Sequence, residues 1–221
     1  MTPPPAPPPL PGPPTLPGAA VGLFGGSFDP IHRGHVEPVR AAREALGLDR
    51  VVYLPTALPP HKPKRDFAPP HARWAMVELA LLGEDGLYAS PFELTLGRPA
   101  YTVETVEAFQ AAHPEVRFHL VIGGDSLAEI ATWRRWRELV VRVPLVVLAR
   151  PGWALEEVRG DLPPELAARA ADPAAVRFVT HAAVDLSSTE LRAALGRGEE
   201  PPAGDLPDRV LDYVRKYRLY R

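Results

Sequence analysis

The chain has 221 residues, enough for one domain of ordinary size with a substantial hydrophobic core. Its formal net charge of −2 argues against a broad nucleic-acid-binding surface, and no apolar run is long enough to span a membrane. The absence of cysteine excludes disulfides, thiolate catalysis and cysteine-bound zinc. We therefore expect a cytoplasmic protein that binds neither nucleic acid nor a membrane.

Residues 1–18 form a proline-rich segment that holds ten of the 29 prolines and almost no charge. Such a composition is typical of an extended, polyproline-like chain with too few groups to join a core. The segment also lacks the basic start and continuous apolar stretch of a signal peptide. We predict a disordered tail over 1–18 and a folded domain over 19–221, with a proline-binding partner as the alternative use of the tail.

Apolar runs typical of buried strands alternate with stretches of helical periodicity along the rest of the chain. The strands are expected at 19–24, 50–54, 118–122, 145–149 and 176–180, with an irregular strand over 87–96. The helices are expected at 36–46, 71–82, 103–112, 156–171 and 207–217, with one broken or two short helices over 127–140. This alternation predicts an α/β fold with a Rossmann-like, doubly wound and mostly parallel sheet in a single domain.

A glycine-rich turn follows the first strand, with the sequence G-G-S-F-D-P-I-H-R-G-H over residues 25–35. Turn amides beside a helix N-terminus suit a phosphate. His32 and His35 are three residues apart, so both imidazoles would project from one side of the first helical turn and could donate to phosphoryl oxygens. The spacing fits neither G-x-G-x-x-G nor a Walker A loop. A surface histidine pair or half of a zinc site is the alternative interpretation.

Further polar groups follow other strands, where parallel α/β sheets place their ligands. The basic stretch 61–65 comes after the second strand, and a second glycine turn at 123–126 carries Asp125 after a central strand. The arginine-rich run 133–137 is interpreted as a solvated helix face.

Two helix starts also stand out. Thr102 is a natural N-cap. Ser187 and Glu190 fit a capping box. Three hydroxyls and Arg192 at that second start would also make a phosphate site.

Two of these motifs together resemble the nucleotidyltransferase superfamily: G-S-F-D-P-x-H-x-G-H at 26–35 and S-S-T-x-L-R at 187–192. The H-x-G-H element alone would also admit class I aminoacyl-tRNA synthetases, but no K-M-S-K-S is present. From residue 19 to the end, the chain resembles the bacterial nicotinate-nucleotide adenylyltransferases. The further matches are P-P-H-K at 59–62, P-A-Y-T at 99–102, G-G-D-S at 123–126, T-W at 132–133, R-P-G at 150–152 and the terminal L-Y-R.

The resemblance implies adenylyl transfer from ATP to nicotinate mononucleotide in NAD biosynthesis, by direct in-line attack with no covalent enzyme intermediate. It implies that His32 and His35 are catalytic, with His35 nearest the transferred group. It further implies that ATP is bound by Gly25, Gly26, Ser27, Phe28, Lys62, Ser188, Thr189 and Arg192. The acceptor would be bound by Tyr101, Thr102, Asp125, Trp133 and Arg150. Mg²⁺ is expected with ATP, bridging its phosphates, and no protein ligand to it is named.

The alternatives come from three classes. One is a sister transferase that uses phosphopantetheine or nicotinamide mononucleotide, or that transfers a cytidylyl group, although the Tyr101–Thr102 and Thr132–Trp133 pairs argue against a different acceptor. Another is an ATP-sensing module without turnover, against which the two intact histidines argue. The third is a protein that acts through its proline-rich tail. The expected partners are small molecules, and a homo-oligomer is left open.

Overall fold

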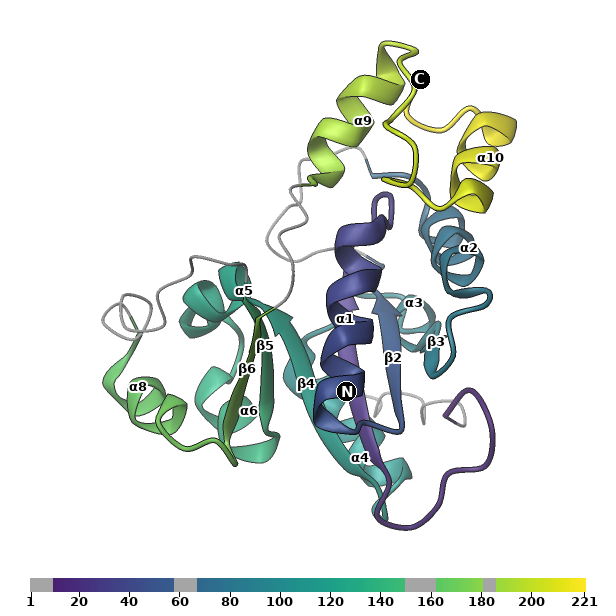
Figure 1. Ribbon diagram of the computed structural model, residues 1–221. Coiled ribbons are helices and arrows are strands. Elements are labelled where there is room, and N and C mark those ends of the chain that lie inside the picture. Colours follow the sequence, from purple (N-terminus) through teal and green to yellow (C-terminus); the bar gives the residue numbers. More distant parts are fainter. Residues whose placement is uncertain (1–9, 58–66, 150–161, 181–185) are drawn as a thin grey trace.

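The computed structural model describes residues 10–57, 67–149, 162–180 and 186–221 (Figure 1). Three sets of predicted features lie outside these described residues. They are residues 1–9 of the proline-rich segment, the basic stretch with Lys62, and Arg150 with the residues after it.

One parallel sheet runs through the domain in the strand order β3-β2-β1-β4-β5-β6. Its strands are β1 (Ala20–Gly26), β2 (Arg50–Pro55), β3 (Leu87–Ala89), β4 (Arg117–Gly123), β5 (Leu145–Ala149) and β6 (Val176–Thr180). The helices are α1 (Arg33–Leu46), α2 (Pro70–Leu81), α3 (Phe92–Thr95), α4 (Thr102–Ala112), α5 (Gly124–Glu129), η1 (Ile130–Thr132), α6 (Trp136–Arg142), α8 (Pro164–Ala170), α9 (Ser188–Gly196) and α10 (Asp208–Tyr217). The predicted α/β, doubly wound class is confirmed.

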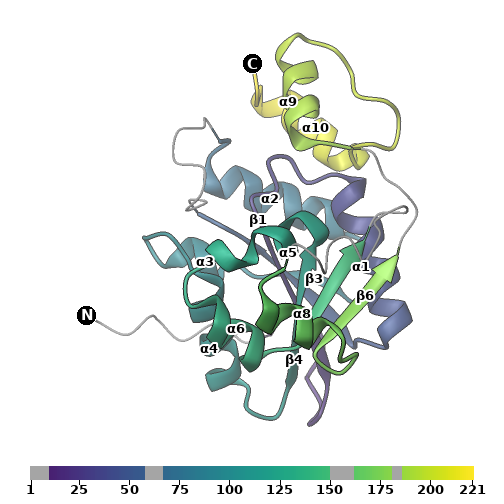
Figure 2. The ribbon, with the colours of Figure 1, turned by 90° about the vertical axis from the view of Figure 1, so that its left-hand side faces the viewer.

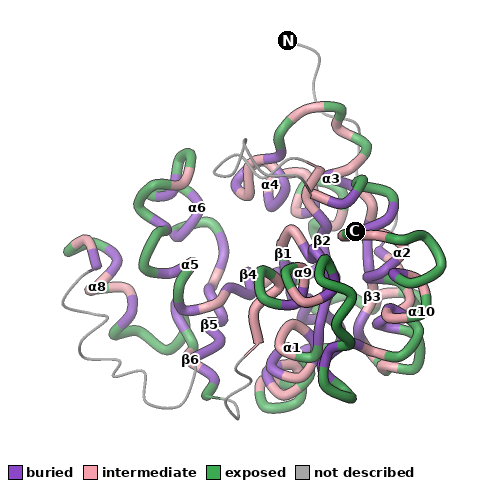
Figure 3. The backbone as a smooth tube through the Cα atoms, turned by 90° about the horizontal axis from the view of Figure 1, so that it is seen from above, coloured by how far each residue is buried: buried purple, intermediate pink, exposed green. Residues whose placement is uncertain are grey.

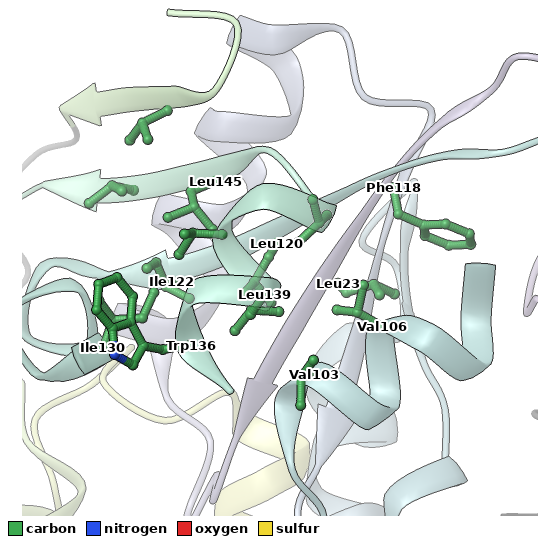
Figure 4. Close-up of a cluster of buried hydrophobic side chains, with 14 of the residues drawn as sticks. Leu23, Val103, Val106, Phe118, Leu120, Ile122, Ile130, Trp136, Leu139 and Leu145 are labelled. Carbon is green, nitrogen blue, oxygen red and sulfur yellow. The ribbon is translucent and has the colours of Figure 1, made fainter. Parts of the chain in front are cut away.

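Helices cover both faces of the sheet and bury two hydrophobic cores. Val21 and Leu23 of β1 join the core under α3, α4, α5, α6 and α8, part of which Figure 4 shows. Ala20 and Phe24, which point to the opposite face, join the core under α1, α2, α9 and α10. Because the strands are covered on both sides, they read as continuous apolar runs, and Figure 3 shows them buried along most of their length.

Most predicted elements are confirmed, but four local predictions are wrong. The region 87–96 is not one irregular strand: β3 ends at Ala89, and Pro91 caps the short helix α3. The N-cap of α4 is Tyr101, and Thr102 is its first helical residue. The glycines at 123–124 do not form a free turn, because α5 starts at Gly124 directly after β4. At α9 the Ser187 hydroxyl accepts the N–H of Thr189 at 3.2 Å, so Ser187 caps the helix without the predicted box partner.

Part of the segment predicted to be a free tail packs on the domain. Leu10 is only 8% exposed and belongs to a core cluster. The buried Arg50 guanidinium donates to the carbonyl oxygens of Pro11 and Pro13 at 2.6 and 2.8 Å. A Cβ at Gly12 would lie 2.6 Å from the Tyr88 ring, so the chain passes directly against that aromatic side chain. Composition did not predict this packing, because it depends on backbone carbonyl groups. These groups can accept hydrogen bonds from any buried donor within reach, whatever the side chains of the segment.

The strand order reverses between β1 and β4, and their carboxyl ends mark the crevice where α/β sheets bind ligands. Helices α9 and α10 lie beyond the end toward which the strand arrows point (Figures 1 and 2). The last elements of the chain therefore border the crevice that begins at β1.

Candidate functional site

His32 and His35 lie together at the start of α1, as predicted. His32 is the N-cap, and its backbone N–H donates to Nδ1 of His35 at 3.3 Å. The two ring centroids are 3.8 Å apart. The buried Phe28 ring meets the His35 ring edge-on at 5.3 Å, and the Tyr53 hydroxyl donates to the His35 carbonyl oxygen at 2.9 Å. The imidazole of His35 is therefore held by the His32 amide and by the rings of His32 and Phe28, while Tyr53 holds its backbone.

The hydrogen bond to Nδ1 determines the protonation of His35. An accepting Nδ1 carries no proton, so the proton of the neutral ring resides on Nε2. Burial, with a smaller contribution from His32, holds the pKa of His35 well below its ordinary value. His35 is therefore a neutral Nε2–H donor near pH 7, and this donor can hydrogen-bond a phosphoryl oxygen.

The glycine-rich stretch owes its shape to Phe28. This residue has a φ of 46°, uncommon for a bulky side chain, and its ring is almost completely buried. A Cβ at Gly26 would lie 2.8 Å from that ring, so only glycine fits beside it. Gly25 and Gly26 are still part of β1, with Ser27 following directly.

The second predicted phosphate motif reaches the first across the crevice. The hydroxyl of Ser188 donates to the Pro30 carbonyl oxygen at 3.1 Å. Arg192 donates to the carbonyl oxygen of Asp29 and lies 3.5 Å from its carboxylate. Arg192 also donates to the hydroxyl of Thr189 at 3.2 Å. The two motifs are about 150 residues apart in sequence, and the fold joins them as the resemblance implied.

Arg73 forms hydrogen bonds to several of the same loops, and no sequence motif indicated this role. Its guanidinium is fully buried and donates to the carbonyl oxygens of Ser27, Ala57 and Ala68 at 2.7, 2.9 and 3.0 Å. Burial lowers the pKa of Arg73, and the charge of Asp29 acts in the opposite direction. The signal that could have identified it is a single arginine inside the apolar stripe of α2. Arginine is rarely buried unless its guanidinium has such hydrogen-bond partners.

Two of the predicted acceptor residues, Tyr101 and Thr102, lie at the N-terminus of α4. Tyr101 caps this helix and Thr102 opens it, so the first backbone amides have no partner within the helix. Trp133 is half-buried against the core on the same face of the sheet. The guanidinium of its neighbour Arg134 stacks 4.6 Å from the centre of the Tyr101 ring, which brings the 132–134 loop beside the start of α4.

The other arginines of the run 133–137 behave as the predicted solvated face. Arg135 bridges Glu107 and Glu138 at 2.8 and 2.6 Å, and Arg137 pairs with Glu165 at 3.3 Å.

Asp125 is exposed near the start of α5, where its carboxylate accepts the N–H of Ser126 at 2.8 Å. No contact with Tyr101, Thr102 or Trp133 is found for it among the described residues, so its acceptor role stays a prediction.

Glu93 is a buried carboxyl group that the sequence analysis did not single out. It is 7% exposed and accepts the Thr105 hydroxyl at 2.8 Å, one turn along α4 from Thr102. Burial raises the pKa of Glu93 to about 7, while hydrogen bonds from Thr105 and Thr56 act in the opposite direction. Thr56 in turn donates its backbone N–H to the Gly26 carbonyl oxygen at 3.0 Å. Glu93 thus connects the acceptor helix with the glycine-rich stretch.

Replacing Glu93 with glutamine is expected to flatten the pH dependence of stability between pH 4.5 and about 7. The folded protein retains the Glu93 proton up to about pH 7, whereas an unfolded chain releases it near 4.5, so wild-type stability is lost as the pH rises through this window. A pKa change of this size corresponds to roughly 3 kcal/mol. Thermal unfolding at a series of pH values measures it, and equal slopes for both proteins would contradict it.

The described residues show no cluster of three or more histidine, aspartate or glutamate side chains placed to hold a metal ion. The buried carboxylate of Asp29, which precedes His32 in the same loop, is already engaged by Ala68, Tyr220 and Arg192. Within the same residues, no helix is both long and apolar enough to cross a membrane.

Comparison with known proteins identifies the family. Residues 23–194 match the cytidylyltransferase-like family model. The chain is 41% identical over 214 residues to the probable nicotinate-nucleotide adenylyltransferase of Laribacter hongkongensis, covering 91% of this chain and 94% of that protein. The corresponding Gloeobacter violaceus protein is 35% identical over 205 residues, covering 92% and 97%. The chain belongs to the nicotinate-nucleotide adenylyltransferase family.

A solved structure supports the fold of this family member. Nicotinic acid mononucleotide adenylyltransferase of Plasmodium falciparum, in complex with NaAD, superimposes with a TM-score of 0.71. The match covers 91% of this chain and 97% of the other at 17% sequence identity, so it establishes the shared architecture. As a nicotinate-nucleotide adenylyltransferase, the chain is a nucleotidyltransferase, and its two predicted phosphate motifs meet at the carboxyl edge of the sheet.

Proposed function

We propose that the protein transfers the adenylyl group of ATP to nicotinate mononucleotide, forming deamido-NAD and pyrophosphate. The observation that carries this proposal is the joining of Arg192 and Ser188 to the Asp29–Pro30 loop directly before His32 and His35. An arginine, helix amides and a neutral imidazole donor then lie at the same edge of the sheet, and these groups together suit a triphosphate. The names of the relatives support the same reaction.

The proposed chemistry is direct displacement at the α-phosphorus. A phosphate oxygen of the mononucleotide attacks, the bond to the bridging oxygen of pyrophosphate breaks, and no enzyme nucleophile takes part. Nε2–H of His35 donates to an oxygen of the transferred group, where charge builds up, and His32 supports the neighbouring phosphate. Ser188, Thr189 and Arg192 hold the outer phosphates. Lys62 is proposed to reach the same phosphates, although it lies outside the described residues.

Mg²⁺ is proposed to arrive with ATP, held between the phosphates and largely by water. The engaged carboxylate of Asp29 and the occupied Nδ1 of His35 fit this arrangement better than a protein-held ion.

The acceptor is proposed to bind between the Trp133 ring and the start of α4. An indole face attracts a flat pyridinium, and the amides at Tyr101 and Thr102 suit the nicotinate carboxylate. Arg134, stacked on Tyr101, adds a positive charge at the same place, and this charge favours the acid over the amide. Asp125 and Arg150 are proposed as further acceptor contacts. The partners are therefore small molecules; a homo-oligomer and a cytoplasmic location stay predictions.

The test is pyrophosphate release by the purified protein with ATP and Mg²⁺. The separate acceptors are nicotinate mononucleotide, nicotinamide mononucleotide and phosphopantetheine. We expect strong preference for the first. Turnover with phosphopantetheine alone would discard the acceptor pocket while leaving both phosphate motifs in place. ATP binding without turnover on any acceptor would overturn the enzymatic proposal.

A further inference from the structure

Leu219 and Tyr220, near the end of the chain, return from α10 to the crevice. Arg218 and Tyr220 have φ values of 52° and 68°, so the chain reverses directly after the helix. The N–H of Leu219 bonds to the Val214 carbonyl oxygen at 3.1 Å and fixes this reversal. Figure 1 shows that the C-terminus lies beside α9, which carries Ser188, Thr189 and Arg192.

Contacts on both sides hold Tyr220 in place. A Cβ at Gly196, the last residue of α9, would lie 3.1 Å from the Tyr220 carbonyl oxygen, so the end of α9 packs closely on this backbone. On the other side, the Tyr220 hydroxyl lies 4.0 Å from the sulfur of Met76 on α2. Its ring packs against the core shared by α1, α2, α9 and α10.

The hydroxyl of Tyr220 donates to Oδ1 of Asp29 at 2.8 Å. Asp29 is completely buried, and the same oxygen accepts the N–H of Ala68 at 3.1 Å. Its other carboxylate oxygen lies 3.5 Å from Nη1 of Arg192. One carboxylate thus receives the end of the chain on one side and the phosphate-motif arginine on the other.

The sharing of the Asp29 carboxylate between Tyr220 and Arg192 affects Arg192. Burial and the charge of Asp29 hold the pKa of Tyr220 well above its ordinary value, so the phenol remains a donor at every physiological pH. Without this donor, the buried carboxylate would rely more on Arg192, because an ionised group needs compensation when it is removed from water. Arg192 would then be less available to an incoming phosphate.

We propose that Tyr220 is a positioning residue for the ATP half of the site: its hydroxyl shares the charge of Asp29, which leaves Arg192 able to bind the outer phosphates. The proposal rests on the proposed function only for the identity of the nucleotide. It assigns a role to the terminal L-Y-R motif that the reaction scheme does not otherwise use.

The test compares Tyr220→Phe, which removes only the hydroxyl, with Tyr217→Phe, which removes the hydroxyl of a largely exposed tyrosine at the end of α10. Removing a hydrogen bond to a charged group is expected to raise the KM for ATP at least about fivefold in Tyr220→Phe. The acceptor KM should change less than twofold, and Tyr217→Phe should match wild type in both. Equal changes in both KM values, or no change, would overturn the proposal.

Calorimetric titration with ATP alone separates this inference from the proposed function, because it needs no acceptor. A weaker ATP affinity in Tyr220→Phe would support the role of Tyr220 even if the wild type transferred nothing to nicotinate mononucleotide.

A double-mutant cycle with Arg192→Lys then tests whether Tyr220 acts on Arg192 through Asp29. Because Tyr220 is proposed to act through Asp29 on Arg192, the two substitutions should be clearly non-additive in ATP affinity. Additive effects, or a lowered melting temperature with unchanged ATP affinity, would reduce Tyr220 to a structural contact.

Discussion

The substitution His35→Ala is expected to lower kcat by at least about a hundredfold, the usual loss when a donor to transition-state charge is removed. Nδ1 of His35 is occupied by the His32 amide, so Nε2–H is the hydrogen that remains for a phosphoryl oxygen. The rings of Phe28 and His32 pack against the imidazole, and the Tyr53 hydroxyl holds the His35 backbone, so the donor is already oriented before the reaction. Steady-state pyrophosphate release and thermal unfolding measure the effect.

A matched variant separates catalysis from helix capping. His35→Asn keeps an acceptor near the position of Nδ1 and can therefore retain the bond from His32, but it has no donor at the Nε2 position. We expect His35→Asn to be as inactive as His35→Ala but more stable. His113→Ala, at the far end of α4, should leave turnover unchanged. A folded His35→Ala protein with near-normal turnover would remove His35 from the mechanism.

The fold was predictable from the sequence because each of its main determinants is local. Strands covered by helices on both faces are apolar throughout, and β5 was placed at its observed bounds for this reason. Gly47 ends α1 with φ 61°, a left-handed conformation that glycine adopts at no steric cost. The region 87–96 was misjudged because three strand residues and four helical ones are too short to show a period.

The site was predictable where its residues are adjacent in sequence. The pairing of His32 with His35 follows from helix geometry, and their position follows from the strand before them. The joining of the two phosphate motifs came from resemblance. No local pattern in 187–192 indicates that Arg192 would reach the buried Asp29.

Residues that act through buried polar bonds could not be found this way. Arg73, Glu93 and Tyr220 each connect segments that are far apart in sequence, and hydrophobic periodicity contains no information on such contacts. Arg50 is a further example: the binding of residues 11–13 depends on a guanidinium that lies in a strand of apolar residues. A charged residue in or beside an apolar run is the signal that Arg50, Arg73 and Glu93 share.

The substitution Trp133→Ala is expected to raise the KM for the acceptor about tenfold or more and to change the KM for ATP less than twofold. Stacking of a flat heterocycle on an aromatic side chain contributes about 1–3 kcal/mol. Trp133→Phe keeps a ring face and should recover most of the loss in acceptor KM. If Trp133 had only a structural role, the acceptor KM of each variant would instead change in step with its melting temperature. Equal effects on both KM values would move Trp133 out of the acceptor pocket.

The same variant separates two sources of acceptor selectivity. Stacking recognises the ring and not its substituent, so Trp133→Ala should weaken the binding of nicotinate mononucleotide and nicotinamide mononucleotide by similar factors. Discrimination between acid and amide would reside instead in the amides at Tyr101 and Thr102 and in the Arg134 guanidinium stacked on Tyr101. The ratio of kcat/KM for the two acceptors should therefore be unchanged in Trp133→Ala. A ratio that collapses toward one would place the acid-recognising contact on the indole side of the pocket, and the start of α4 would lose its assigned role.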